Sequence, residues 1–407
     1  MARPDAPDQT MTSATANHAP LGLYIHWPFC LAKCPYCDFN SHVSDTVDMA
    51  AFGDALCQEM THMAGLLAAP RPLTSLFFGG GTPSLMTPAL IGRVIDHANK
   101  LFGLDPAVEI TAEANPTSVE AGRMLAFRRT GVNRVSMGVQ SLDDKVLAFL
   151  GRAHSATEAQ HALDTIRTEF DQVSIDLIYA TPGQTKARWQ QQLAQALAFD
   201  LAHLSLYQLT IEPGTVFYSR QRRGEVMTLN DDRAAALYDI TQEMTGVAGL
   251  PAYEISNHAK PGFECQHNLT YWQGGDWLGI GPGAHGRFTI HRQDGASTSR
   301  RATHNRRSPA GWLQAVFRDG HGIDEMHDEG VADWAAEMVM MGLRLHRGIN
   351  LTQIERLCGP QTDWLDPAGI ATCIDAGWLD YDKSRSQIAA SDAGRVRLNS
   401  ILAKILA

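Results

Sequence analysis

Residues 25–39 read Ile25-His26-Trp27-Pro28-Phe29-Cys30-Leu31-Ala32-Lys33-Cys34-Pro35-Tyr36-Cys37-Asp38-Phe39, with cysteines at the spacing C-x3-C-x2-C. Iron–sulfur clusters are held by cysteine thiolates. The thiolates of Cys30, Cys34 and Cys37 would bind three irons of a [4Fe-4S] cube and leave the fourth iron open to another ligand. Zinc is the alternative, because it accepts three thiolates with one further ligand, here a carboxylate or an imidazole such as that of His26 or His42.

This stretch resembles the signature of the radical S-adenosylmethionine (SAM) superfamily, in which an aromatic residue, here Tyr36, precedes the third cysteine. Residues 24–29 are similar to the entry of the subgroup that contains the oxygen-independent coproporphyrinogen III oxidases and the HemW-type haem chaperones. The oxidases carry a further cysteine directly after the third one. This chain has Asp38 followed by Phe39 there, which is similar to the chaperone branch. The resemblance covers nearly the whole chain.

The composition is that of a globular protein with more than one domain. The chain has 407 residues, of which 44% are hydrophobic and 19% charged, and this length exceeds what one core usually supports. The formal net charge is −10. Nucleic acid is therefore excluded as a main partner, because phosphate binding needs clustered positive charge. We interpret the arginine-rich residues 287–307 as a solvated loop, able to meet haem propionates or an acidic partner.

The cysteines outside the triplet are scattered, at Cys57, Cys265, Cys358 and Cys373. They do not form a disulfide framework, and free thiols and iron–sulfur clusters both fit a reducing compartment. Residues 1–20 lack the apolar core of a secretory signal and are expected to be a disordered tail. No apolar run is long enough to span a bilayer. We therefore expect a cytoplasmic protein with at most peripheral membrane contact.

Short β-branched or aromatic runs alternate with helical segments from Leu21 onward, which is typical of βα units around a parallel sheet. The expected strands are residues 23–26, 75–78, 108–112, 134–138, 173–178 and 203–208; the expected helices include 47–67, 88–102, 119–130 and 187–198. Six such units predict an α/β fold, a partial (β/α)6 TIM-like radical SAM barrel. In parallel barrels the chemistry gathers at the carboxyl ends of strands, and polar motifs follow several of these strands.

One of these motifs is Gly79-Gly80-Gly81-Thr82-Pro83-Ser84, after the second strand. Glycines let the backbone approach a ligand closely, although an ordinary turn is the alternative. The resemblance implies that this segment holds the methionyl end of SAM. It implies SAM contacts from Tyr24, Tyr36, Gly80, Gly81, Thr82, Glu113, Gln140, Arg152 and Asp176. SAM carries a carboxylate, an ammonium group, hydroxyls and a sulfonium, for which a guanidinium, two carboxylates and an amide are a suitable complement.

The segment from Tyr253 to about Arg287 has no clear period. It contains Cys265-Gln266-His267-Asn268-Leu269-Thr270-Tyr271-Trp272, in which the string His-Asn-x-x-Tyr-Trp resembles a signature of the HemW-type chaperones. The resemblance implies that His267 binds haem, with Tyr271 and Trp272 available to stack on the porphyrin. Cys265 is a second candidate ligand, and a purely structural histidine is the alternative.

The glycine-rich residues 279–286 are expected to form a loop that closes the open side of the barrel. They do not fit a dinucleotide fingerprint, because Pro282 removes a backbone donor and a strong strand-then-helix context is missing. His285 in this loop is a further, weaker candidate for haem ligation.

From about Val331 the pattern indicates helices, a short hairpin near residues 383–386 and a last helix over residues 392–406. This order is typical of a winged-helix-like domain, and with few basic residues we expect it to contact protein or cofactor and not DNA. The expected division is a tail (1–20), a radical SAM partial barrel with the cluster (21–252), a barrel-closing segment with the haem motif (253–329) and the winged-helix-like domain (330–407).

Two functions share the predicted cluster. The favoured one is a haem chaperone that binds haem and a SAM-coordinating [4Fe-4S] cluster and delivers haem to recipients such as respiratory enzymes, with no catalytic residue assigned. The alternative is oxygen-independent coproporphyrinogen III oxidation by radical SAM decarboxylation. Asp38, and the few residues before the barrel, favour the chaperone. A zinc-stabilised interaction protein is a remote third class. A homodimer is compatible with the sequence but not required by it.

Overall fold

The computed structural model describes residues 20–44, 46–67, 71–291 and 298–406. The tail expected over residues 1–20 lies outside the described residues except for Pro20. No helix within these ranges is long and apolar enough to cross a membrane.

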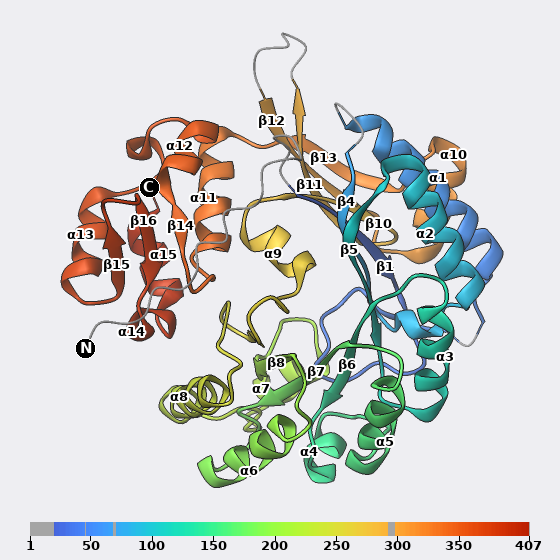
Figure 1. Cartoon of the computed structure of the whole chain (residues 1–407), viewed down its shortest axis with the longest axis horizontal. Coiled ribbons are helices and arrows are strands. Elements are labelled where there is room, and N and C mark those ends of the chain that lie inside the picture. Colours follow the sequence, from blue (N-terminus) through green and yellow to red (C-terminus); the bar gives the residue numbers. More distant parts are fainter. Residues whose placement is uncertain (1–19, 45, 68–70, 292–297, 407) are drawn as a thin grey trace.

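One curved sheet of eleven strands dominates the described part of the chain, in the order β13-β12-β11-β10-β1-β4-β5-β6-β7-β8-β9 (Figure 1). Its parallel strands are β1 (Leu21–Trp27), β4 (Leu73–Gly80), β5 (Leu104–Ala114), β6 (Arg134–Gln140), β7 (Gln172–Tyr179) and β8 (His203–Gln208), with β10 (Asp276–Ile280) parallel to β1. The first six are the strands predicted from the sequence. The α/β fold class is confirmed.

Helices cover the convex face of the parallel strands (Figure 1). They are α1 (Met49–Leu66), α2 (Pro88–Phe102), α3 (Ser118–Arg128), α4 (Asp144–Phe149), α5 (Ala156–Ile166) and α6 (Lys186–Leu197). At the far edge, α7 (Val216–Arg222), α8 (Asp231–Val247) and β9 (Asn257–Ala259) follow β8. A short 3-10 helix, Pro83–Leu85, follows β4.

The parallel strands alternate between apolar and polar residues, although parallel strands covered by helices on both faces usually read as continuous apolar runs. Residues buried on the helix-covered face are apolar, such as Ile25, Phe78 and Ile175. Residues with the opposite parity are mostly polar and line the concave face: Tyr24, His26, Ser75, Glu109, Thr111, Glu113, Arg134, Ser136, Ser174, Asp176, His203, Ser205 and Tyr207. Because successive side chains of a strand point to opposite faces, this alternation builds a polar interior.

The expectation that residues 279–286 form a loop closing the open side of the barrel is wrong. Gly279 and Ile280 belong to β10, which lies beside β1, and residues 281–284 turn into β11 (His285–His291). Strands β11, β12 (Thr298–Asn305) and β13 (Ile323–Asp328) then extend the sheet as antiparallel neighbours beyond β10. The helix α9 (Gln266–Trp272), and not the glycine-rich loop, lies on the concave side of the sheet (Figure 1).

The interpretation of residues 287–307 as a solvated loop is also wrong. Arg300 is 1% exposed, because strand pairing places it over Trp277 and against Asp276, with its Nη1 atom 3.1 Å from the Oδ1 atom of the carboxylate. The side chain of Arg287 pairs with Glu329 and Glu337. Residues 292–297 lie outside the described residues.

The antiparallel extension is fixed to the barrel by one buried carboxylate. Glu59 of α1 accepts hydrogen bonds from the backbone amides of Gly281 and Gly322, from the amide of Asn305 and from the indole of Trp312 in α10 (Pro309–Asp319), at 2.7–3.1 Å. Each partner lies in the segment from β10 to β13. A carboxylate with several donors holds a buried position that it would otherwise not tolerate.

The C-terminal residues have a hydrophobic core of their own, around Trp334, Leu343, Trp364 and Ile401. Its elements are α11 (Val331–Gly342), β14 (Ile349–Asn350), α12 (Leu351–Cys358), the 3-10 helix Gln361–Asp363, α13 (Pro367–Asp375), β15 (Leu379–Asp382), β16 (Gln387–Ala390), α14 (Asp392–Arg395) and α15 (Leu398–Ile405). The single last helix predicted over residues 392–406 is divided, because Gly394 packs against the carbonyl of Trp378 and α15 begins anew after Arg397.

Candidate functional site

The cysteine loop lies at the carboxyl end of β1 and is bonded to the loop that follows β4. Between the two loops, the amide of Gly81 donates to the carbonyl of Trp27 at 2.7 Å and the amide of Thr82 to the carbonyl of Phe29 at 2.9 Å. A Cβ atom on Gly81 would lie 2.7 Å from the Phe29 carbonyl oxygen and 3.0 Å from the sulfur of Cys30. The close approach of the loops therefore requires glycine at this position.

The three cysteines of the loop are half-buried and carry free thiols. The hydroxyl of Thr82 lies 3.4 Å from the sulfur of Cys30, and the Nη1 atom of Arg152 lies 3.3 Å from the sulfur of Cys34. Burial raises the pKa of the Cys30 and Cys37 thiols, and repulsion adds to the shift, from Cys37 and Cys34 at Cys30 and from Cys34 and Asp38 at Cys37. Three close thiols with donors aimed at two of them fit an iron–sulfur cluster, in which hydrogen bonds to the sulfurs tune the redox potential.

The two imidazoles considered for zinc have other partners. The Nε2 atom of His26 is 2.9 Å from the carbonyl oxygen of Asn40, and that of His42 is 3.3 Å from the side-chain oxygen of the same residue. Within the described ranges, no group of three or more His, Cys, Asp or Glu side chains, the three cysteines included, already surrounds a single metal-ion position, so the cluster is inferred from the cysteine spacing and the neighbouring donors. Asp38 is exposed.

Arg152 connects the cysteine loop with two strand ends. Its Nη2 atom donates to the side-chain oxygen of Asn115 at 2.6 Å and to the carbonyl of Gly138 at 2.9 Å. Asn115 is also 3.4 Å from the hydroxyl of Thr82. The Arg152 side chain thus joins β5, β6 and the cysteine loop in one polar network.

Two carboxylates lie in the concave interior below this network. Glu113 of β5 accepts the backbone amide of Gly80 at 3.2 Å, and Asp176 of β7 accepts the hydroxyl of Ser136 at 3.2 Å. Burial raises the pKa of Glu113 to about 8, with repulsion from Asp176 as the second cause; burial raises the pKa of Asp176 to about 6. Among the described residues neither carboxylate has an ion-pair partner within 4.0 Å. This interior therefore suits a cationic ligand, as the ammonium and sulfonium of SAM are.

The remaining residues expected to contact SAM lie around the same space. Gln140 ends β6 with φ at 64°, a left-handed conformation that is strained for a residue with a side chain, and its amide lies against Gly138. Tyr24 donates from its hydroxyl toward the Nδ1 atom of His26 at 3.1 Å. Tyr36 packs toward Phe217 of α7, with the ring centroids 6.3 Å apart.

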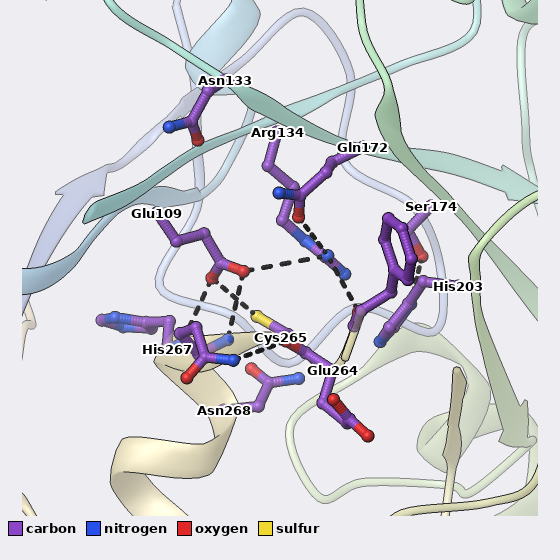
Figure 2. A network of polar contacts seen from close by, with 12 residues as sticks. Glu109, Asn133, Arg134, Gln172, Ser174, His203, Glu264, Cys265, His267 and Asn268 are labelled. Atoms are coloured by element: carbon purple, nitrogen blue, oxygen red, sulfur yellow. Dashed lines mark hydrogen bonds and ion pairs between the residues drawn. The ribbon is translucent and has the colours of Figure 1, made fainter. Parts of the chain in front are cut away.

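Helix α9 brings the predicted haem motif into this interior, and Figure 2 shows its first turn. His267 is 2% exposed. Its Nδ1 atom is 2.8 Å from the hydroxyl of Ser75 and its Nε2 atom 2.6 Å from the hydroxyl of Tyr271. Its ring stacks on Phe77 and lies 6.1 Å from the ring of Tyr24. Burial lowers the pKa of His267 to about 3, so the imidazole is neutral, but both of its nitrogens are engaged.

The rings of Tyr271 and Trp272 do not lie together. Tyr271 packs edge-on against Trp277 at 4.7 Å and against His267 at 4.8 Å. Trp272 lies under the guanidinium of Arg344, 4.6 Å from its ring centroid. The structure therefore does not present both rings to one porphyrin in this conformation.

The start of α9 is held by a carboxylate that the sequence did not single out. Glu109 of β5 accepts the amides of Gln266 and His267 and the thiol of Cys265 at 3.1–3.2 Å, and Arg134 of β6 lies 3.8 Å away (Figure 2). Burial raises the pKa of Cys265 to about 12, so this candidate haem ligand is a protonated thiol. The sequence did carry one signal for Glu109 and Asn115. Both lie an even number of residues from Glu113, along β5 or just beyond it, and so are expected on the same face of the sheet.

Comparison with known proteins agrees with the resemblance. The model of the radical SAM superfamily matches residues 24–194. The heme chaperone HemW of Escherichia coli is 36% identical over 95% of this chain and 98% of its own length. This chain belongs to the HemW-type haem chaperone family of the radical SAM superfamily. Another relative, the mouse radical S-adenosyl methionine domain-containing protein 1, mitochondrial, is 39% identical over 86% of this chain and 77% of its own length.

The fold of this HemW-type chain also has a solved counterpart. Coproporphyrinogen III oxidase (HemN) from Escherichia coli, described as a radical SAM enzyme, superposes with a TM-score of 0.78 over 95% of this chain and 90% of its own chain. The sequence identity is 23%, so the likeness concerns the fold alone.

Proposed function

We propose that this protein is a haem chaperone, which takes up haem, holds a [4Fe-4S] cluster with SAM, and passes haem to recipient proteins such as respiratory enzymes in the cytoplasm. The observation that supports this most is the full-length similarity to a protein named as a haem chaperone. The chaperone branch is further supported by Asp38, where the oxidases carry a cysteine.

In this proposal Cys30, Cys34 and Cys37 hold the cluster, which when bound supplies an open iron for SAM and an electron for its cleavage. The residues around it bind and orient SAM. Glu113 and Asp176 attract the cationic groups in an interior whose described residues offer them no other ion-pair partner. The Arg152 guanidinium donates to Cys34 and to Asn115, which keeps the cysteine loop and the end of β5 in register. Gly80 and Gly81 let the backbone approach the ligand.

The motif on α9 is the part of the haem site that the resemblance implies. For iron to reach His267, the hydrogen bond from Tyr271 has to break and α9 has to move from the concave face, because the ring is buried between Phe77 and Tyr24. We propose that the neutral state of this imidazole prepares it for ligation, since iron binds the neutral ring.

The test uses protein purified and reconstituted without oxygen. We expect iron and sulfide but no zinc, uptake of ferric haem with a new Soret band, and transfer of that haem to a haem-free globin. With coproporphyrinogen III, SAM and a reductant we expect no protoporphyrinogen. Absence of haem uptake, or turnover of coproporphyrinogen, would contradict the proposed function; zinc without iron would remove the cluster.

A further inference from the structure

A pair of histidines lies on the β11–β12 pair of strands, at the end that adjoins the turn before β11. His285 of β11 and His304 of β12 are directly opposite each other in the antiparallel register. Their rings stack with centroids 4.0 Å apart and an interplanar angle of 11°. His285 is exposed and His304 half-buried. Among the residues that the structure describes, nothing forms a hydrogen bond with either ring.

The backbone next to both histidines is rigidly held. The amide of Asn305 donates to the carbonyl of Ala284 at 2.9 Å, and the side chain of Asn305 donates to the carbonyl of Gly281 and to the buried carboxylate of Glu59. The imidazoles are therefore presented from a fixed turn, as a preorganised binding site requires.

The cysteine loop is tied to the same place. The amide group of Asn40 donates to the carbonyls of Pro282 and Arg307, each at 2.9 Å. Its neighbour Phe39 is 57% exposed. The loop that is bonded to the turn before His285 thus exposes a large apolar ring one residue before Asn40.

Positive charge is available beside the pair. Arg287 is ion-paired with Glu329 and Glu337, and Arg306 is ion-paired with Asp324. Arg307 is exposed, and no carboxylate of the described residues lies within 4.0 Å of it. The pKa of His285 is lowered to about 4, first by the partial desolvation of its ring beside its neighbours and then by the charges of His304, Arg287, Arg307 and His26. His285 is therefore neutral and has a lone pair available.

We propose that the iron of an incoming haem is ligated by His285, whose ring is held by His304, while Arg307 pairs with a propionate and Phe39 packs on the macrocycle. This inference rests on the proposed function. It names the residue that ligates the haem iron in the described conformation, in which His267 is buried and both of its ring nitrogens are hydrogen-bonded. The surface around His285, His304 and Arg307 adjoins the cysteine loop through Asn40, so haem would be held beside the cluster site.

The first test compares ferric haem binding by the wild type, the double variant His285→Ala/His304→Ala, and His267→Ala. The matched control is His327→Ala, an exposed histidine on β13. Because the cluster absorbs near the Soret band, difference spectra are combined with EPR of the ferric haem. Loss of an iron ligand should weaken binding at least about tenfold, the scale reported for lesser changes around metal ligands, and should alter the EPR signal. The control should bind haem as the wild type does, and His267→Ala, which removes the imidazole on α9, should weaken binding less than the double variant does.

The second test reverses one charge. Arg307→Glu should weaken binding of ferric haem but not of haem dimethyl ester, whose propionates carry no charge, while Arg347→Glu on the C-terminal domain leaves both unchanged. Unaltered binding by the double variant, or loss of binding in His267→Ala alone with an intact melting curve, overturns this inference and leaves the chaperone proposal standing. Absence of haem uptake by the wild type overturns both.

Discussion

Glu113 and Asp176 lie on either side of β6 and have no ion-pair partner in the described interior. The protonation of Glu113 should therefore make the free energy of unfolding depend on pH. The folded-state pKa of Glu113, about 8, lies above the ordinary value of 4.5. Its contribution to the free energy of unfolding is therefore fully present below pH 4.5 and is lost as the pH rises to about 8. Without SAM, we expect the wild type to lose on the order of 4 kcal/mol relative to Glu113→Gln over this range.

Urea unfolding of both proteins at several pH values measures this difference, with Glu243→Gln on the exposed face of α8 as the control. A constant gap between wild type and Glu113→Gln across the range would mean that Glu113 titrates normally. SAM should reverse the trend, because its cationic groups favour the ionised carboxylates.

Individual site residues were predictable where spacing or a strand end carries the information. The spacing of Cys30, Cys34 and Cys37 is read from the sequence alone, and the rule for parallel barrels predicts polar residues at the ends of β4, β5 and β6; their contacts with SAM were implied by the resemblance and stay predictions. The strand parity of Glu109 places it on the concave face, but its role as the acceptor for α9 was not predictable, because its partners are amides more than 150 residues later in the chain. The burial of His267 is likewise a product of the packing of α9 on β1 and β4.

At the scale of elements, α9 depends on a cap from another strand. Cys265 precedes the helix but its side chain makes no capping hydrogen bond, and Glu109 of β5 takes that role. In Glu109→Ala, two amides and a thiol lose their acceptor and Arg134 loses its buried partner, which should cost about 3–5 kcal/mol. Glu109→Gln keeps an acceptor and should cost less.

Chemical denaturation and amide hydrogen exchange check this prediction. Exchange at residues 266–272 should accelerate in Glu109→Ala before the rest of the barrel responds. Glu325→Ala on the exposed edge strand β13 serves as a carboxylate control. Unchanged protection of α9 in Glu109→Ala would show that the helix is held by its apolar contacts alone.

The elements also show where pattern-based prediction ends. Strands β1 and β4–β8 were found because apolar residues recur in them at strand spacing between helical segments. Strands β10–β13 were missed because between them they carry glycine, histidine, arginine and acidic residues, which are typical of loops. Arg300 becomes a core residue only through Asp276 and the rings of Trp277 and Trp334, contacts that no local pattern contains.

At the scale of the whole molecule, α9 also joins the barrel to the C-terminal core. Arg344, after α11, covers the ring of Trp272, and its Nη2 atom lies 3.3 Å from the Oε2 atom of the fully buried Glu254. The backbone amide of His346 donates to the carbonyl of Tyr253 at 2.9 Å. The same short helix thus contacts the floor of the barrel at its first residues and the C-terminal domain at its last.

This arrangement predicts that Arg344 couples the unfolding of the two parts. Arg344→Ala leaves Glu254 buried without its ion pair and uncovers Trp272, which should cost about 3 kcal/mol. Calorimetry should then resolve an earlier transition for the C-terminal core. Arg344→Lys restores the charge but not the planar contact with the indole, so its melting temperature should lie between those of the wild type and Arg344→Ala. Equal melting of all three proteins would place the coupling in the apolar contacts between α9 and α11.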